Sequence, residues 1–143
     1  DMLIFCIGTM KPIGNFLDVP YDEWENCIRT NAFLPLQIFR GFYAFHRPGA
    51  RVFFFDGPNL EKPTPTYSAY RAGKAILAAL VPTLNAECPD VQFTLLHTGV
   101  VKTKIHNQTI EAGECAANYD RVVGILEGKE PTTSYDDIYR MIA

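Results

Sequence analysis

The sequence lacks both a run of basic residues and a long run of apolar ones. Its 143 residues include 13 Lys and Arg against 16 Asp and Glu, giving a net charge of −3, and the basic residues are not clustered. This charge pattern does not suggest a nucleic-acid partner, which would need a basic surface, and we expect none. No apolar stretch approaches the roughly 20 residues of a membrane-spanning helix, and no signal peptide opens the chain. We therefore expect a soluble protein with no membrane partner.

Cysteines are few and widely separated: Cys6, Cys27, Cys88 and Cys115. They form no Cys-x-x-Cys pair and have no histidine at the spacing of a metal ligand. The pattern argues against a disulfide framework and against a zinc site, because both need their ligand residues at defined spacings. We predict free thiols, no metal site and a cytoplasmic location.

The composition is that of one globular domain. Hydrophobic residues make up 48% of the chain and charged residues 20%, which is typical of soluble folded proteins. The length is sufficient for one hydrophobic core and too short for two domains of ordinary size. The sequence opens directly on an apolar strand pattern and stops within a helical pattern. We therefore interpret residues 1–143 as a single partial domain, incomplete at its N-terminus and truncated at its C-terminus.

Short apolar runs alternate with amphipathic helical patterns along the chain. The strand patterns cover residues 2–7, 51–55 and 91–96. The helical patterns cover residues 21–45, 66–88 and 113–126. A last helix is predicted to begin at Ser134 with Asp137 as its capping partner, and residues 100–112 are predicted to form a long loop. The alternation predicts an α/β fold, an open, doubly wound parallel sheet of Rossmann type with right-handed crossovers.

One stretch near the middle of the chain contains a candidate pair for acid–base catalysis. Tyr70 and Lys74 are four residues apart, so on a helix they share one face. An ammonium group near a phenol favours the phenolate and lowers the pKa of the phenol from about 10 toward neutrality. A tyrosine tuned in this way can act as a general acid or base. The alternative is an ordinary surface pair, because this spacing often occurs by chance.

Asn31 lies in the middle of a predicted helix, four residues before Pro35. Because proline has no N–H, it cannot donate the helical hydrogen bond to the Asn31 carbonyl, and we expect the helix to bend there. A carbonyl left free inside a protein needs another partner, such as an ordered water. The alternative is an asparagine on the solvent side, next to a kink that serves packing.

Candidate functional residues follow each of the predicted strands. Gly8 follows the first strand, Asp56 and Gly57 the second, and His97 and Gly99 the third. Ligands of open parallel sheets bind beyond the carboxyl ends of the strands, and the tyrosine–lysine helix is entered from the second of these ends. The predicted topology therefore places these candidate residues along one edge of the sheet. A histidine at a strand end is more often structural, so a catalytic role for His97 is the less favoured alternative.

At this point the chain resembles the C-terminal two-thirds of a short-chain dehydrogenase/reductase. The resemblance rests on the Tyr70-x-x-x-Lys74 pair, on Asn31 with Trp24 seven residues before it, and on residues 97–103 after the third strand. The order and spacing agree from residue 3 to residue 142. The resemblance implies an NAD(P)-dependent oxidoreductase that interconverts a hydroxyl and a carbonyl of a small-molecule substrate. It also implies a homodimer or homotetramer.

The resemblance implies a role for each matched residue. Tyr70 would exchange a proton with the substrate oxygen, while Lys74 would lower the pKa of Tyr70 and bind the nicotinamide ribose. Asn31 would hold a water of the proton relay through its main-chain carbonyl. The residues that would contact the cofactor, NAD or NADP, are Tyr70, Lys74, Gly8, Gly99 and Thr103.

The substrate side of the site departs from the family pattern. The family usually has a serine thirteen residues before the tyrosine, where this chain has Gly57, preceded by Asp56. A glycine has no side-chain donor, and a carboxylate at Asp56 would repel a developing oxyanion unless it were protonated or turned away. Ser68 and Asn59 are possible substitutes for the serine.

The glycine-rich turn that binds a dinucleotide pyrophosphate has no match in the chain. Gly8 and Gly14 lack a third glycine at the required spacing, and Gly124 and Gly128 come late. The choice between NAD and NADP is therefore not readable. A second hypothesis follows from these departures: a non-catalytic, degenerate dinucleotide-binding protein that acts as a sensor or scaffold. A third is a fragment without independent function.

Overall fold

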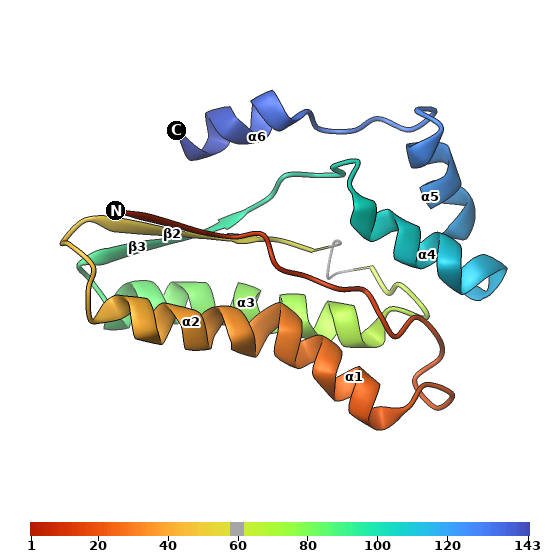
Figure 1. The fold of residues 1–143 in the computed structure, drawn as a ribbon, viewed down its shortest axis with the longest axis horizontal. Helices are drawn as coiled ribbons and strands as arrows, with labels where there is room; N and C mark the ends of the chain where they lie inside the picture. Colours follow the sequence, from red (N-terminus) through yellow and green to blue (C-terminus); the bar gives the residue numbers. More distant parts are fainter. Residues whose placement is uncertain (58–61) are drawn as a thin grey trace.

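A parallel sheet of three strands forms the centre of the fold (Figure 1). The computed structural model describes residues 1–57 and 62–143. The strands are β1 (Met2–Phe5), β2 (Ala50–Phe55) and β3 (Val91–Leu96), in that order across the sheet. All three predicted strands are confirmed, although β1 ends at Phe5, before residue 7. Continuous apolar runs of this kind suit strands that neighbours cover on both faces.

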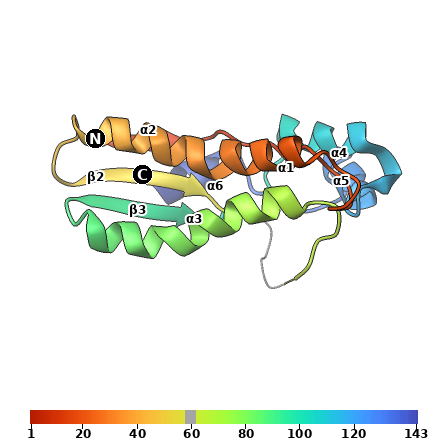
Figure 2. The same ribbon diagram turned by 90° about the horizontal axis from the view of Figure 1, so that it is seen from below.

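Helices lie on both sides of the sheet. One face is covered by α1 (Tyr21–Ile28), α2 (Leu34–Tyr43) and α3 (Ser68–Glu87), with α1 packed against α3. Figure 2 shows this helical face from below. The opposite side of the sheet carries α6 (Tyr135–Ile142). The predicted α/β fold class with a Rossmann-type parallel sheet is confirmed.

The main hydrophobic core lies between the sheet and the layer of α2 and α3. Alternate strand residues point toward these helices, and among them Phe5 stacks on Phe54 with ring centres 5.2 Å apart. Phe39 of α2 meets Phe93 edge-on at 4.7 Å, and Leu77 comes up from α3. Burying a side chain of this size contributes roughly 1.5–3 kcal/mol. This layer therefore fixes the position of α3, which carries Tyr70 and Lys74.

The long helix predicted over residues 21–45 is interrupted where Pro35 lacks its N–H. A π-helical turn, Arg29–Phe33, separates α1 from α2, and the Leu34 N–H bonds the carbonyl of Arg29, five residues back. Because a π turn inserts one extra residue, the chain continues as a helix beyond the proline. The expected irregularity is confirmed, and its form is a π turn.

Residues 100–112 were predicted to form a loop, and that prediction is wrong for their second half. A 3-10 turn at Lys104–His106 leads into α4 (Asn107–Ala112), which ends at Gly113 with a φ of +77°. The helix predicted from residue 113 is delayed to α5 (Tyr119–Leu126). Both helices lie beyond the carboxyl ends of the strands (Figure 1). The hydrophobic pattern of the sequence does not indicate α4, because the residue that is fully buried on the inner side of this helix is Thr109 and not an apolar residue.

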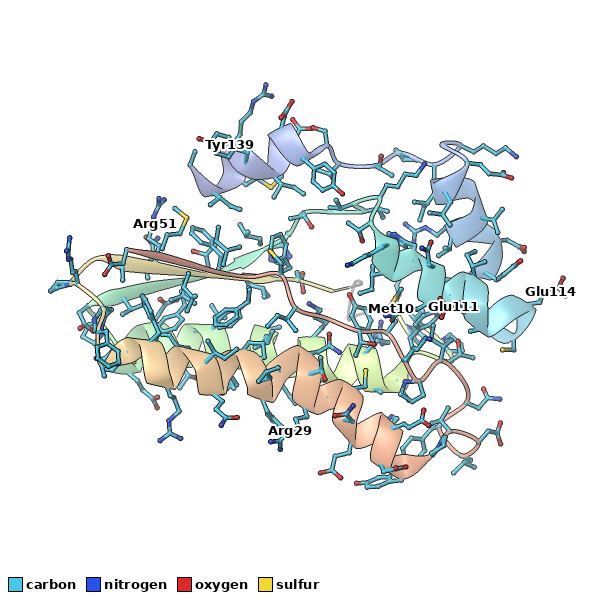
Figure 3. The ribbon with its side chains drawn as sticks, in the orientation of Figure 1. Met10, Arg29, Arg51, Glu111, Glu114 and Tyr139 are labelled. Carbon is cyan, nitrogen blue, oxygen red and sulfur yellow. The ribbon has the colours of Figure 1, made fainter. Side chains whose placement is uncertain are left out.

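The last helix begins as predicted. Ser134 caps α6, and its Oγ accepts a hydrogen bond from the Asp137 N–H at 3.1 Å. Arg51 on β2 donates to the Ile142 carbonyl at 3.1 Å, and Figure 3 shows Arg51 on the side of the sheet where α6 lies. Within residues 1–57 and 62–143 no helix has the length and apolar character needed to cross a bilayer.

Candidate active site

Tyr70 and Lys74 occupy the first two turns of α3 and share one face, as their spacing predicts. The Lys74 Nζ lies 5.7 Å from the centre of the Tyr70 ring. The helix starts next to the end of β2, so both side chains lie at the carboxyl edge of the sheet. An ammonium at this distance from an aromatic ring is attracted to its negative face. The pair is therefore a structural unit and not two independent surface residues.

Lys74 is buried, and its ammonium is fixed by the end of β2. Only 7% of the residue is exposed, and Nζ donates a hydrogen bond to the Phe55 carbonyl at 2.8 Å. Burial lowers the pKa of Lys74, and the negative charge of Asp56 partly opposes this shift. The lysine is thus held in one position by a backbone group that cannot move away.

Gly57 makes this position of Lys74 possible. A Cβ added at Gly57 would lie 2.6 Å from Lys74 Cγ and 2.8 Å from its Cβ, both closer than van der Waals contact allows. The lysine stem thus occupies the space that a side chain at residue 57 would need. The glycine that replaces the family's serine is therefore part of the packing of Lys74.

Tyr70 is largely buried among apolar groups, and its pKa differs from the sequence expectation. It packs in a cluster with Met10 and Ile105. Burial raises the pKa of Tyr70 to about 12, and the charges of Asp56 and Cys27 add to the effect. The predicted lowering of this pKa by Lys74 is wrong for this arrangement. Burial is the main cause of the raised pKa, and the Lys74 ammonium, which lies over the ring and bonds the Phe55 carbonyl, does not lower it.

Asn31 is buried, so the solvent-side alternative is wrong. Its Nδ2 donates to the carbonyls of Thr9 and Cys27, both at 2.8 Å, and its Oδ1 accepts from the Thr9 N–H at 3.2 Å. The side chain therefore ties the segment after β1 to the helix layer. Gly8 and Gly73 leave room for the Asn31 side chain. A Cβ added at Gly8 would lie 3.1 Å from Asn31 Oδ1, and one added at Gly73 would lie 2.8 Å from Asn31 Cβ.

The carboxylate of Asp56 has two partners at the strand ends. Its Oδ1 accepts a hydrogen bond from the Gly57 N–H at 2.7 Å, and its Oδ2 forms an ion pair with His97 Nδ1. The strand register explains the pairing, because Phe55 is aligned with Leu96 and the next residues are Asp56 and His97. The sequence does not indicate this contact, because it depends on β2 and β3 being neighbours in the sheet.

The remaining predicted cofactor residues lie on the segment between β3 and α4. Gly99 has a φ of +67°. Thr133 holds the residues on either side of Gly99: its Oγ1 donates to the Thr98 carbonyl at 2.5 Å, and its N–H donates to the Val100 carbonyl at 2.7 Å. Thr103 caps the turn before α4. The segment before α6 therefore holds Gly99 beyond the sheet edge, and the turn before α4 holds Thr103 there. The geometry groups Gly8 with Asn31, and Asp56 and Gly57 with Lys74.

A short helix, α4, is bound to the segment that follows β1. Gln108 Oε1 accepts hydrogen bonds from the Met10 N–H at 2.7 Å and from Thr9 Oγ1 at 3.2 Å. Tyr67 and Thr109 share a buried hydroxyl hydrogen bond of 2.9 Å. Figure 3 shows Met10 beside α4. These contacts place α4 over the apolar cluster that contains Tyr70.

Of the possible substitutes for the serine, Ser68 is committed elsewhere. Its Oγ accepts a hydrogen bond from Trp24 Nε1 at 2.9 Å, which joins the start of α3 to α1. Asn59 lies outside the described residues. In the part of the chain that the structure describes, no three His, Cys, Asp or Glu side chains gather where they could hold a metal ion.

The fold and this geometry can be compared with known proteins. A family model described as short chain dehydrogenase matches residues 1–113. The chain belongs to the short-chain dehydrogenase family. A curated relative from Schizosaccharomyces pombe, named as an uncharacterized oxidoreductase, is 26% identical over 106 residues, which cover 72% of this chain and 42% of that protein.

Solved structures show that this short-chain dehydrogenase chain has the fold of larger proteins. The KRED1-Pglu enzyme matches with a TM-score of 0.81 at 22% identity, over 90% of this chain and 55% of that enzyme. An alcohol dehydrogenase from the archaeon Thermococcus sibiricus, complexed with 5-hydroxy-NADP, matches with a TM-score of 0.61 at 23% identity, over 72% of this chain and 44% of that one. The chain thus spans between 42% and 55% of the length of these proteins.

Proposed function

We propose that the protein is an NAD(P)-dependent oxidoreductase that interconverts a hydroxyl and a carbonyl group, with Tyr70 as acid and base. The family and the naming of the yeast relative as an oxidoreductase support the general class. The observation that carries the specific proposal is the fixed Tyr70–Lys74 pair at the carboxyl edge of the sheet. Ligands of open parallel sheets bind at this edge.

The residues present fit the nicotinamide end of the cofactor. Gly8 is exposed and has no side chain above Asn31, so its backbone is open to a flat ligand. Gly99 and Thr103 offer backbone and hydroxyl groups beyond the same edge, and Lys74 offers a fixed ammonium. No glycine-rich turn for the pyrophosphate occurs in the sequence, so the fit covers the nicotinamide and its ribose for either NAD or NADP. A bound reduced nicotinamide supplies the hydride that forms the new C–H bond.

The protein side of the reaction is proton transfer at the Tyr70 hydroxyl. During reduction, the Tyr70 O–H donates its proton to the substrate oxygen as the carbonyl π electrons move onto that oxygen. Because burial raises the pKa of Tyr70 to about 12, the hydroxyl keeps its proton at neutral pH. This arrangement therefore supplies a protonated hydroxyl as the proton donor of carbonyl reduction. Asn31 holds the segment of Gly8 and Thr9 in place, and the Lys74 Nζ lies over the ring.

The proposal is tested by assaying the full-length protein beside its Tyr70→Phe variant. The panel is benzaldehyde, cyclohexanone, butanedione and ethyl acetoacetate, each with NADH and with NADPH. We expect turnover by the parent and a loss of about 100-fold or more in kcat for Tyr70→Phe, the usual contribution of a general acid. Tyr43→Phe is the matched control, because Tyr43 bonds Asp90 at the other end of the sheet. Equal rates for Tyr70→Phe and the parent would contradict the proposal.

A second candidate function is a non-catalytic dinucleotide-binding protein. The packing of Lys74 over Gly57 favours it, because the space for the usual serine is already filled. Calorimetric titration with NADH and NADPH, carried out on the same preparation, separates the two functions. Binding of either cofactor by a parent that turns over no member of the panel would support the second candidate.

A further inference from the structure

A histidine–aspartate pair lies at the same carboxyl edge of the sheet as Tyr70 and Lys74. Asp56 follows β2 and His97 follows β3, and the Asp56 N–H donates to the Leu96 carbonyl at 3.0 Å, which aligns the two strand ends. The carboxylate of Asp56 is close enough to act electrostatically on both Tyr70 and Lys74. His97 is therefore attached, through Asp56, to the residues of the proposed reaction.

The two side chains of this pair differ in exposure. Asp56 is largely buried, with 20% of its side chain exposed, whereas 75% of the His97 side chain is exposed. Asp56 Oδ2 contacts Nδ1, so in the protonated ring Nδ1–H is used and Nε2 carries a second N–H. Among residues 1–57 and 62–143 no partner occupies Nε2. One end of the imidazole is thus anchored, and the other is accessible to a small molecule.

In the described part of the chain, the position of the family's serine offers no side-chain donor. Gly57 has no side chain, and the space that one would fill is occupied by the stem of Lys74. The Lys74 ammonium is bonded to Phe55, and the Ser68 hydroxyl lies against α1, where it accepts from Trp24. A second hydrogen-bond donor at the reacting oxygen stabilises the charge that develops there during reduction. His97 is a described side chain at this edge with a donor position open.

We propose that His97, anchored by Asp56, donates a hydrogen bond from Nε2 to the oxygen of the carbonyl substrate, in the role that a serine at residue 57 would have. Asp56 is then a positioning residue, because it acts by orienting His97. The Nε2–H of His97 is not transferred, and the proton of the new hydroxyl comes from Tyr70. The inference rests on the proposed oxidoreductase function.

Variants at the pair test this role on the full-length protein, with the panel carbonyl that the parent reduces fastest. We expect His97→Ala to lower kcat by about 10- to 1000-fold, the usual effect of losing one donor at a developing oxyanion, with a smaller change in KM. His97→Gln retains a side-chain amide donor and should keep more activity than His97→Ala. Since the ring is three-quarters exposed, added imidazole should enter the space left in His97→Ala and restore activity. The double variant Asp56→Asn/His97→Ala should not respond, because it lacks the anchor.

The matched control is His46→Ala. His46 also pairs with an aspartate, with Nε2 2.7 Å from Asp90 Oδ2, but at the opposite end of the strands, and its removal should leave kcat unchanged within about twofold. An active parent with an equally active His97→Ala overturns the role of His97 and leaves the proposed function standing. A loss that imidazole does not restore indicates a structural histidine and also overturns it. A parent that reduces no panel member overturns the proposed function, and this role with it.

Discussion

At the scale of single residues, the site is decided by competition between desolvation and charge. The ammonium of Lys74 lies near the Tyr70 ring, yet the pKa of Tyr70 is raised, because burial disfavours the charged phenolate and the charges of Asp56 and Cys27 add to the effect. Lys74 is affected in the same way, and its pKa is lowered mainly by burial. A sequence motif gives the spacing of such a pair, whereas the solvent exposure that sets its pKa values comes from the tertiary structure.

The raised pKa of Tyr70 has a direct consequence for the pH dependence of the proposed reaction. Alcohol oxidation needs the phenolate, whose fraction increases about tenfold per pH unit below the pKa. With a pKa of about 12, we expect the oxidation rate to keep rising from about pH 7 to about pH 10, while carbonyl reduction stays nearly constant. Initial rates in both directions across this range test the expectation. An oxidation rate that levels off near neutrality would contradict it.

The packing at Gly57 predicts the outcome of restoring the family's serine. In Gly57→Ser the new side chain must displace the stem of Lys74, so we expect a loss of stability of about 1–3 kcal/mol, typical of overpacking. Urea unfolding followed by circular dichroism measures the loss. Gly41→Ser is the matched control, because a Cβ at Gly41 meets nothing within 4 Å. Equal stabilities for the parent and Gly57→Ser would show that Lys74 moves aside at no cost.

At the scale of elements, the strand patterns and the proline signal were readable from the sequence. Val91–Leu96 coincides with its predicted range, and Pro35 marks the irregular turn between α1 and α2. Two features were not readable. The α4 helix owes its position to Gln108 and the buried Thr109, whose partners lie far away in the chain. The contact between Asp56 and His97 depends on which strands are neighbours, and that is a property of the sheet.

The end of α2 is fastened to the turn before β3 by a second histidine–aspartate pair. The hydrogen bond to the Tyr43 carbonyl and the contact with Asp90 raise the pKa of His46 above 6.5, and the bond to His46 lowers the pKa of Asp90 below 3.8. A histidine whose pKa is raised by folding stabilises the fold fully below about pH 6.5, and this stabilisation is lost as the pH rises through the pKa of the folded state. An aspartate whose pKa is lowered by folding stabilises the fold fully above about pH 3.8, and this stabilisation is lost as the pH falls through the pKa of the folded state. The pair therefore stabilises the fold fully between about pH 4 and about pH 6.5.

We expect the destabilisation caused by His46→Ala to be larger at about pH 5 than at about pH 9. The reason is that the charged contact with Asp90 is present only at the lower of these values. Thermal unfolding of the parent and the variant at both pH values provides the comparison. His106→Ala is the matched control, because His106 contacts the backbone of Thr103 and has no carboxylate partner in the described part of the chain. A difference between parent and His46→Ala that does not change with pH would contradict the expectation.

At the scale of the whole molecule, α2 carries apolar side chains on its outer surface. A shallow groove there is lined by Phe33, Leu36, Gln37 and Arg40, and 49% of Phe33 is exposed. We keep as a proposal the homodimer or homotetramer that the family resemblance implies, with this surface as part of the contact. Apolar surface of this kind is stabilised by burial against a second copy.

We expect Phe33→Glu to shift the full-length protein toward monomers, because a carboxylate would have to be buried in the contact between copies. Light scattering coupled to gel filtration measures the mass of the parent and the variant. Phe45→Glu is the matched control, because Phe45 is also exposed but follows the end of α2. An unchanged mass for Phe33→Glu would place the contact on another surface.

The attachment of α4 by Gln108 implies a minor state of the molecule. The two hydrogen bonds that Gln108 Oε1 accepts from Met10 and Thr9 contribute about 1–3 kcal/mol together. Their loss would raise the population of molecules with a detached α4 by a factor of about 5 to about 160. Ile105 packs with Tyr70 just before α4, so a molecule that approaches Tyr70 from that side binds only from the detached state. Its association rate constant is then proportional to the fraction of molecules with α4 detached, so the detachment of α4 controls the exchange of such ligands.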